Sequence, residues 1–351
     1  MMHGGDVWQG DAPSAWLDFS ANIRPEGVPE WVRRAMLEGM ENVCYYPDPQ
    51  MRRSRAALAE YLGLDADCVL PTAGGISAIA LAARLPAKGM RAFAPCFGEY
   101  RQMAAQQGVR MEEISILGAG HEILRPAAVL QGRNVADCAL WLCNPLNPVG
   151  VAFSAAELGE LLDLVEAEKG WLIVDEAFIE FCPEYSVRRW IARHERLIVT
   201  GSMTKALGIP GARLGYLCAQ PQVLRALQKS QLTWELNAFA DAVLCALPRH
   251  EAELRADAQK NAARREQLRG GLEALGAFVY PSSSSFLLAD FGRDVRAVAA
   301  RLRRAGILVR ECMDFRFVDD GRHLRLAVKD EAANKRLLEE LKGALTCAEN
   351  H

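Results

Sequence analysis

Three reactive side chains stand where apolar segments of the chain end. The segment "WLIVDEAFIEF" reaches Asp175, "LCNPLNPVG" carries Asn147 between two prolines, and "RLIVTGSMTK" reaches Lys205. The carboxyl ends of strands in an open α/β sheet face the ligand crevice, so we expect the acid, the amide and the amine to converge there. An amine can attach a carbonyl compound covalently, and a nearby acid can stabilise the charge that then develops.

Pyridoxal phosphate is a cofactor that requires this set of groups. It needs an amine for a Schiff base, an acid that keeps its ring nitrogen protonated, and donors for its phenolate oxygen and its phosphate. Lys205, Asp175 and Asn147 match the first three requirements in that order. Glycines at the start of the helical segment in "TAGGISAIALAARL" would let the backbone approach the phosphate. The residues expected around the phosphate are Gly74, Gly75, Ile76, Ser202, Thr204 and Arg213.

Each of these features has a simpler interpretation when it is taken alone. A Gly-Gly pair before a helix is usually a tight turn, a single lysine is usually a surface charge, and Asp175 could cap a helix. The ordered set favours the cofactor. It consists of a glycine loop, N-x-x-N-P-x-G, D-E-A-F, S-x-T-K and an arginine eight residues after the lysine.

Helical segments alternate with short apolar strands along most of the chain. The strand-like segments are "RAFAP", "RMEEISI", "CALWLCNP", "WLIVDEAF", "RLIVTGS" and "ARLGYLCA". The predicted helices cover 29–40, 51–62, 75–84, 98–107, 154–168 and 221–247. Strands that are apolar on both faces suit a mostly parallel sheet covered by helices, so the sequence predicts a doubly wound α/β domain.

A second, smaller α+β domain is expected at the C-terminus. A chain of 351 residues is long for one hydrophobic core, because cores tend to split above about 250–300 residues. The charged helical stretch from about 250 to 275 leads into strands such as "RHLRLAV" and a helix near 293–305. We therefore expect an N-terminal arm and small-domain segment in 1–40, a large cofactor-binding domain in 41–250 and the small domain in 251–351.

Composition argues against several classes of protein. A net charge of −3 and an isoelectric point near 6.1 lack the basic excess of a protein that binds nucleic acid or a membrane surface. No apolar run approaches the ~20 residues of a membrane helix, so we expect a cytoplasmic protein. The ten cysteines are scattered singly, without a C-x-x-C pair, which predicts no metal site.

The chain resembles the fold-type I pyridoxal-phosphate enzymes, in the branch that contains histidinol-phosphate aminotransferase and L-threonine-O-3-phosphate decarboxylase. The segments that carry the resemblance are "HGGD", "LDFSANIRPEGVP", "YYPDP", "DEAFIEF", "IPGARLGY", "TWELNAFA" and "LVRECMDF". It extends from His3 to about Leu341. It implies pyridoxal 5′-phosphate as cofactor, Lys205 as its Schiff-base lysine, and a homodimer with shared active sites, in which Tyr46 reaches the cofactor phosphate of the neighbouring subunit.

The resemblance also indicates residues for the substrate. His3 and Gly4 match an N-terminal arm that closes over the ligand, Asn22 lies near it, and Arg310 and Arg325 match two arginines that hold the substrate's anions. A phosphorylated amino acid carries a carboxylate and a phosphate, and planar guanidinium groups bind both. The simpler alternatives are a strand-edge salt bridge for Arg325 and a disordered terminal residue for His3.

The aromatic residues bear on the type of reaction. Many aminotransferases of this fold have tyrosine where this chain has Phe178, whereas the decarboxylases resemble it, so Asn147 alone is expected at the phenolate oxygen. Phe97 is expected to stack on the cofactor ring, with Tyr100 as a second candidate and core packing as the alternative. The resemblance thus implies decarboxylation of O-phospho-L-threonine to 1-amino-2-propanol O-phosphate, a reaction of cobalamin biosynthesis.

Several positions depart from the pattern and leave the substrate open. Ala73 and Ser77 stand where the family's glycine loop usually has asparagine and glutamate, and Gly201 stands at a frequent arginine position. Ala206 and Leu207 replace an aromatic pair after the lysine. Alternatives are an aminotransferase acting on histidinol phosphate or an aromatic amino acid, another pyridoxal-phosphate-dependent lyase such as a C–S cleaving enzyme, and a non-catalytic binding protein of this fold.

Overall fold

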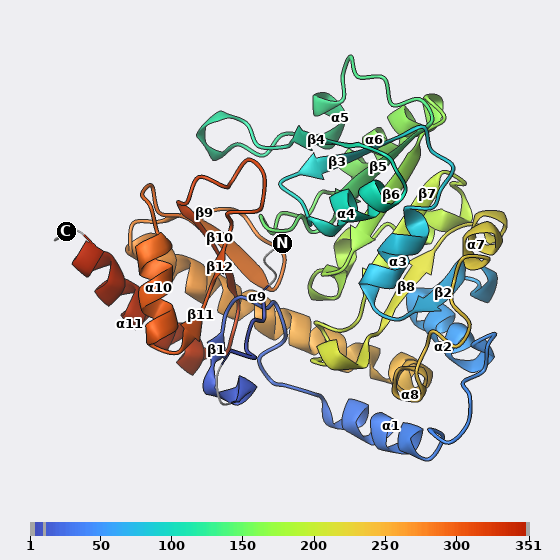
Figure 1. Cartoon of the computed structure of the whole chain (residues 1–351), viewed down its shortest axis with the longest axis horizontal. Helices are drawn as coiled ribbons and strands as arrows, with labels where there is room; N and C mark the ends of the chain where they lie inside the picture. The colour runs from blue at the N-terminus through green and yellow to red at the C-terminus, as the bar shows by residue number, and fades with distance from the viewer. Residues whose placement is uncertain (1–3, 10–11, 349–351) are drawn as a thin grey trace.

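A seven-stranded sheet forms the centre of the larger part of the molecule (Figure 1). The computed structural model describes residues 4–9 and 12–348. The strand order is β2-β8-β7-β6-β5-β3-β4. Strand β8 runs opposite to the other six strands, which all point in one direction. The bounds are β2 Val69–Thr72, β3 Gly89–Ala94, β4 Met111–Ser115, β5 Cys138–Cys143, β6 Trp171–Glu176, β7 Leu197–Ser202 and β8 Gly215–Cys218. The predicted, mostly parallel α/β sheet is confirmed.

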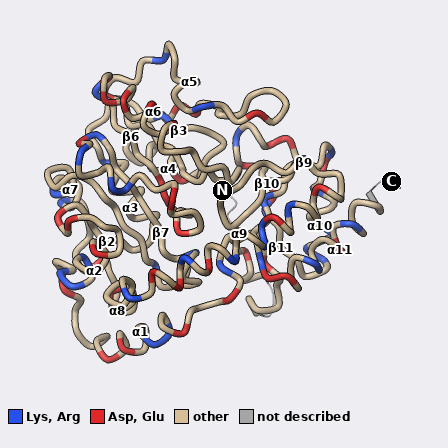
Figure 2. The backbone as a smooth tube through the Cα atoms, turned by 180° about the vertical axis from the view of Figure 1, so that it is seen from behind, with Lys and Arg blue, Asp and Glu red and all other residues tan. Residues whose placement is uncertain are grey.

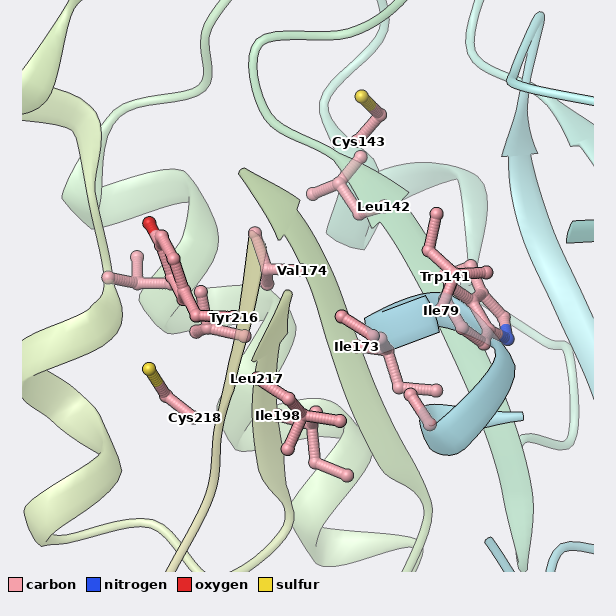
Figure 3. Close-up of a cluster of buried hydrophobic side chains, with 14 of the residues drawn as sticks. Ile79, Trp141, Leu142, Cys143, Ile173, Val174, Ile198, Tyr216, Leu217 and Cys218 are labelled. Atoms are coloured by element: carbon pink, nitrogen blue, oxygen red, sulfur yellow. The ribbon is translucent and has the colours of Figure 1, made fainter. Parts of the chain in front are cut away.

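Helices cover this sheet because its central strands are apolar on both faces. Every residue of β6 and β7 is buried, so the side chains on both faces of the sheet need packing partners. Figure 3 shows Trp141 and Ile173 of the sheet beside Ile79 of α3. The helices of this part are α1 Glu30–Met40, α2 Arg52–Leu62, α3 Gly75–Ala82, α4 Glu99–Gln106, α5 Pro126–Val129, α6 Ala155–Ala167, α7 Pro221–Gln228 and α8 Ala238–Ala246.

The single helix predicted over 221–247 is wrong, because the chain leaves the helical conformation between α7 and α8. Trp234 lies in the left-handed region with φ of 59°, which an α-helix does not allow. Asn237 then caps the second helix, since its side chain accepts a hydrogen bond of 2.9 Å from the backbone N–H of Ala240. The apolar periodicity continues through both helices and hid the interruption.

A four-stranded antiparallel sheet with its own hydrophobic core lies beside the larger sheet (Figure 1). Its order is β12-β13-β10-β9, with β9 Phe278–Val279, β10 Phe286–Asp290, β12 Arg310–Glu311 and β13 His323–Ala327. Helices α10 Arg296–Arg304 and α11 Glu331–Ala348 belong to this part. The N-terminal segment joins it, because β1 Leu17–Asp18 pairs in parallel with β11 Ile307–Leu308 and Phe19 is buried in the same core.

One long helix connects the two sheets. Helix α9, Glu251–Ala274, runs from the end of α8 to the four-stranded sheet (Figure 1). Helix α1 packs along α8, and its Trp31 and Val32 belong to the larger core. The division of the chain into 1–40, 41–250 and 251–351 stays a prediction.

Short 3-10 helices complete the connections. Their bounds are η1 Pro13–Ala15, η2 Ala66–Cys68, η3 Ala119–His121, η4 Ile179–Phe181, η5 Pro183–Tyr185, η6 Arg188–Ala192, η7 Pro210–Ala212 and η8 Leu247–His250. Figure 2 shows basic and acidic residues interspersed along the outer helices α1, α2, α10 and α11. None of the helices in the described part of the chain has the length and apolar character needed to cross a membrane.

Candidate active site

A cavity of about 610 Å³ opens at the carboxyl edge of the central strands. The register aligns Cys143 of β5 with Asp175 of β6, and Asp175 with Thr200 of β7, so the residues after these strands meet at one edge. The predicted residues that line the cavity are Gly4, Asn22, Gly75, Ile76, Phe97, Asn147, Asp175, Phe178, Ser202, Thr204, Lys205, Arg213, Arg310 and Arg325. Tertiary structure therefore gathers candidates from the N-terminal segment, the large sheet and the small sheet.

Two of the predicted residues, Gly74 and Tyr46, are not among those that line this cavity, and Tyr46 is expected at the cavity of the neighbouring subunit. Gly74 packs against Arg213, since a Cβ at this position would come within 2.7 Å of the Arg213 guanidinium. Tyr46 does not line this cavity; it is 80% exposed and stacks on Trp234 with ring centroids 4.5 Å apart. His3 lies outside the described residues.

Lys205 and Asp175 are both buried in the cavity wall. Burial lowers the pKa of the Lys205 amine below its ordinary value, against the opposing attraction of the Asp175 carboxylate. Its Nζ donates a hydrogen bond of 3.3 Å to Oγ of Ser202, which in turn lies 2.9 Å from the hydroxyl of Thr204. The Phe178 ring centroid is 5.2 Å from Nζ. A lysine with a lowered pKa is more often neutral, and therefore nucleophilic, at neutral pH.

Asp175 accepts hydrogen bonds from three groups that hold its carboxylate in place. Tyr100 donates to Oδ2, while the backbone N–H of Ala177 and the hydroxyl of Thr200 donate to Oδ1 over 3.1 and 3.3 Å. Burial raises the pKa of Asp175, and these hydrogen bonds oppose that shift. Tyr100 stacks on Trp141 beneath the cavity and does not line it, so Phe97 remains the candidate for ring stacking.

The glycine loop forms the N-terminus of α3, where backbone N–H groups are available to an anion. Gly215 of β8 allows the close approach, because a Cβ there would lie 2.5 Å from the backbone of Gly74 and Gly75. Arg213 adopts φ of 57° above the loop and lines the cavity with Ser202 and Thr204. These amides, hydroxyls and guanidinium form a donor set suited to a phosphate group.

Glu235 is a loop residue that sequence reasoning missed. Its Oε1 accepts a hydrogen bond of 2.8 Å from the backbone N–H of Ala73 and another from the hydroxyl of Ser77. Ala73 and Ser77 are the two positions at which the loop departs from the family pattern. A carboxylate from the α7–α8 connection therefore contacts both. The separation of 158 residues between Ser77 and Glu235 left no local signal.

The small sheet and the N-terminal segment supply the wall of the cavity that contains Arg310 and Arg325. Arg325 donates 2.7 Å hydrogen bonds to Oδ1 of Asn147 and to the carbonyl oxygen of Ser20. Its Nε, and Oδ1 of Asn22, are buried and make no hydrogen bond within the described chain. Arg310 forms an ion pair of 2.6 Å with Asp314. Unsatisfied buried polar atoms in a cavity wall are suited to a polar ligand.

The N-terminal segment contributes residues that the sequence did not indicate. Val7, Trp8 and Asp18 line the cavity. Asp18 accepts hydrogen bonds from the backbone and hydroxyl of Ser20, over 2.8 and 2.6 Å, and the Ser20 hydroxyl accepts one from the N–H of Gly5. The local signal was the D-x-S turn in "LDFSAN", which is typical of Asp side chains that bind a backbone N–H two residues later.

Residues 14–341 match the family model described as aminotransferase class I and II. The chain belongs to this family. It is similar to threonine-phosphate decarboxylase of Salmonella typhimurium, with 31% identity over 98% of this chain and 96% of the relative. It is equally similar, at 31%, to histidinol-phosphate aminotransferase of Symbiobacterium thermophilum, over 94% of this chain and 90% of that protein. The crystal structure of histidinol-phosphate aminotransferase from Clostridium acetobutylicum superposes with a TM-score of 0.86 at 26% identity, covering 93% and 98% of the two chains.

Membership of the aminotransferase class I and II family makes the chain a pyridoxal-phosphate-dependent enzyme. The cavity fits this cofactor. Its volume lies in the ~300–1,000 Å³ range of ligand sites, and it brings together a buried amine, a buried carboxylate and a helix N-terminus suited to a phosphate. Enzymes of this family are typically dimeric.

Proposed function

We propose that the chain decarboxylates O-phospho-L-threonine to CO₂ and 1-amino-2-propanol O-phosphate. The observation that carries the proposal is the presence of two buried arginines, Arg310 and Arg325, in the wall of the cavity that contains Lys205. Two guanidinium groups suit a substrate with two anions, a carboxylate and a phosphate. Histidinol phosphate has no carboxylate and would use only one of them, whereas the dicarboxylate 2-oxoglutarate of a transamination would use both, so the two reactions are separated by the experiment below.

The residues around Lys205 support binding of the cofactor. We infer that Lys205 attaches it, that Arg213, Ser202, Thr204 and the N–H groups of Gly75 and Ile76 hold its phosphate, and that Phe97 packs against its ring. Bound pyridoxal phosphate supplies an electron sink for the bond that breaks at the substrate's Cα.

Asp175 and Lys205 have separate proton roles in this proposal. Ionised Asp175 would hold the cofactor's ring nitrogen and keep it protonated through a charge-assisted hydrogen bond. Lys205, whose lowered pKa lets it exchange a proton near neutral pH, returns a proton to Cα after CO₂ has left.

Arg325 orients the substrate. Asn147 and the Ser20 carbonyl hold the guanidinium from two sides, and its Nε remains available to an oxyanion. An arginine fixed in this way restricts the direction of the substrate carboxylate, and this direction decides which bond at Cα breaks. Phe178 lacks the hydroxyl that many aminotransferases place at the corresponding position.

We further propose a homodimer in which Tyr46 completes the neighbouring active site. Large apolar side chains are exposed over the segment 37–46, namely Leu37, Met40, Val43, Tyr45 and Tyr46, and the stacked Trp234 extends this surface. Extended exposed apolar surface is typical of an interface.

The second candidate is an aminotransferase, because the aminotransferase relative is as similar in sequence as the decarboxylase. A binding protein without activity is disfavoured, because Lys205 and Asp175 are retained in one cavity.

One experiment separates decarboxylation from transamination. Holoenzyme is incubated with O-phospho-L-threonine in the absence of any keto acid, and CO₂ and the cofactor's visible absorbance are followed. We expect many equivalents of CO₂ per site with the absorbance maintained. Stoichiometric conversion to pyridoxamine phosphate, with turnover only after 2-oxoglutarate is added, would instead establish the aminotransferase.

A further inference from the structure

Arg310 and Arg325, the two arginines in the cavity wall, differ in how their charge is balanced. Arg310 of β12 is 5% exposed, and its Nη2 lies 2.6 Å from Oδ1 of Asp314. Its Nη1 donates to the carbonyl oxygen of Glu311 over 2.8 Å, and its guanidinium lies 5.0 Å from the Phe315 ring centroid. The guanidinium is thus held by backbone and ring while a carboxylate of the same chain covers its charge.

Arg325 has no such carboxylate. Its hydrogen-bond acceptors, Asn147 and the Ser20 carbonyl, are neutral, and it forms no ion pair within residues 4–9 and 12–348. Burial lowers its pKa to about 10, and Asp18 and Asp314 act on it only from a distance. A buried and uncompensated guanidinium binds any carboxylate or phosphate that reaches it.

Asp314, the ion-pair partner of Arg310, belongs to the wall of the cavity. Both side chains line the cavity that contains Lys205, and the Asp314 side chain is 31% exposed. Because its side chain is partly exposed, Asp314 can turn toward solvent when another anion takes its place on Arg310.

We propose that Asp314 is a specificity-determining residue that occupies Arg310 and yields it to a phosphate ester but not to a second carboxylate. The inference rests on the proposed function, because it assigns the substrate's phosphate to Arg310 and its carboxylate to Arg325. A competing carboxylate only replaces Asp314 with an equal charge and leaves two carboxylates side by side. A phosphate brings up to two charges and three acceptor oxygens, so it gains more from Arg310 than Asp314 loses.

This arrangement excludes abundant acidic amino acids by repulsion. L-Glutamate and L-aspartate carry the same α-carboxylate as a phosphorylated amino acid and would satisfy Arg325 equally well. Discrimination therefore depends on the other end of the ligand, where Asp314 opposes a carboxylate. Selectivity through an unfavourable contact with the wrong ligand is as effective as an added contact with the right one.

The test compares Asp314→Asn with the wild-type holoenzyme by equilibrium binding. Asparagine keeps the shape of the side chain and removes its charge. The probes are L-glutamate, followed by cofactor absorbance, and 1-amino-2-propanol O-phosphate, followed by calorimetry. We expect the dissociation constant for L-glutamate to fall about tenfold or more, because the substitution removes a like-charge contact with its side-chain carboxylate, while that for the phosphate ester falls about threefold at most. Asp294→Asn, which removes the partner of Arg296 outside the cavity, is the matched control and should change neither constant.

Equal changes in the two constants, or no change in either, would overturn the inference. Failure of the proposed function has a different signature. If the wild-type enzyme releases no CO₂ from O-phospho-L-threonine but Asp314→Asn still gains L-glutamate binding, the selectivity of the cavity stands and the reaction is reassigned.

Discussion

The hydroxyl of Tyr100 donates a hydrogen bond of 2.5 Å to Oδ2 of Asp175, and both side chains are buried. A phenol that donates to a carboxylate stabilises its ionised form. Burial works in the other direction and raises the pKa of Asp175. Tyr100 therefore helps keep a carboxylate charged in an environment that favours protonation.

Removal of this hydroxyl should change the pH dependence of turnover. In Tyr100→Phe the pKa of Asp175 rises further, so the acid limb of the pH–rate profile moves to higher pH and kcat at neutral pH falls about tenfold, as for the loss of a hydrogen bond to a charged group. The control is Tyr61→Phe, whose hydroxyl binds the buried Glu180 away from the cavity. An unshifted acid limb in Tyr100→Phe would contradict the role of Tyr100.

The Lys205 amine should react with the cofactor only when the amine is uncharged. Burial lowers the pKa of this amine, so the rate of cofactor attachment to apoprotein should rise with pH and level off below the ordinary lysine value of 10.5. Stopped-flow absorbance measures this midpoint. Borohydride should fix the cofactor to the peptide that contains Lys205 in wild-type protein and to no peptide in Lys205→Ala, whereas the exposed Lys88→Ala should behave as wild type.

Glu235 should influence cofactor affinity through the glycine loop. Glu235→Ala leaves the N–H of Ala73 and the hydroxyl of Ser77 without their acceptor, and we expect cofactor affinity to fall about tenfold with kcat little changed at saturation. Glu235→Gln keeps an acceptor oxygen and should remain within about threefold of wild type. Fluorescence titration of apoprotein measures both constants. Wild-type affinity in Glu235→Ala would show that the loop does not depend on this carboxylate.

Subunit complementation tests the proposed sharing of active sites. Tyr46→Ala and Lys205→Ala proteins should each be strongly impaired. After mixing and exchange of subunits, a mixed dimer combines the intact Lys205 of one protomer with the intact Tyr46 of the other, so activity should return. Mixtures that stay as weak as the separate variants would place Tyr46 outside the neighbouring site. Sedimentation velocity on each sample verifies that dimers form.

Glu176 should make stability fall as pH rises. Burial raises the pKa of this carboxyl to about 7, well above its value of about 4.3 in unfolded chains. A group with a raised folded-state pKa contributes stability that is complete below the unfolded pKa and is lost as pH rises through 7. The loss amounts to about 3 kcal/mol between pH 4 and 8. Urea unfolding should show a flatter profile for Glu176→Gln, and equal slopes would refute the assignment.

Local patterns in the sequence predicted the centre of the fold. Asp175 and Lys205 follow apolar strands, and parallel strands end at a common edge, so their convergence follows from topology alone. The glycines at the start of α3 were predictable for a different reason, because a close backbone approach depends on the residue itself. The predicted helix over 221–247 failed because apolar periodicity cannot reveal the turn at Trp234, where φ changes sign.

The sequence by itself determined the chemical groups, their order along the chain and the α/β class, because strand and helix periodicity and turn residues act over a few neighbouring positions. Only the tertiary structure decided which side chains these chemical groups contact. Tyr100 meets Asp175 across 75 residues, Glu235 meets Ser77 across 158, and Arg325 meets Asn147 across 178. It also made the two arginines unequal, since Asp314 covers the charge of Arg310 whereas neutral oxygens hold Arg325. Such differences depend on which charges share a buried space, and that is a property of packing between distant segments.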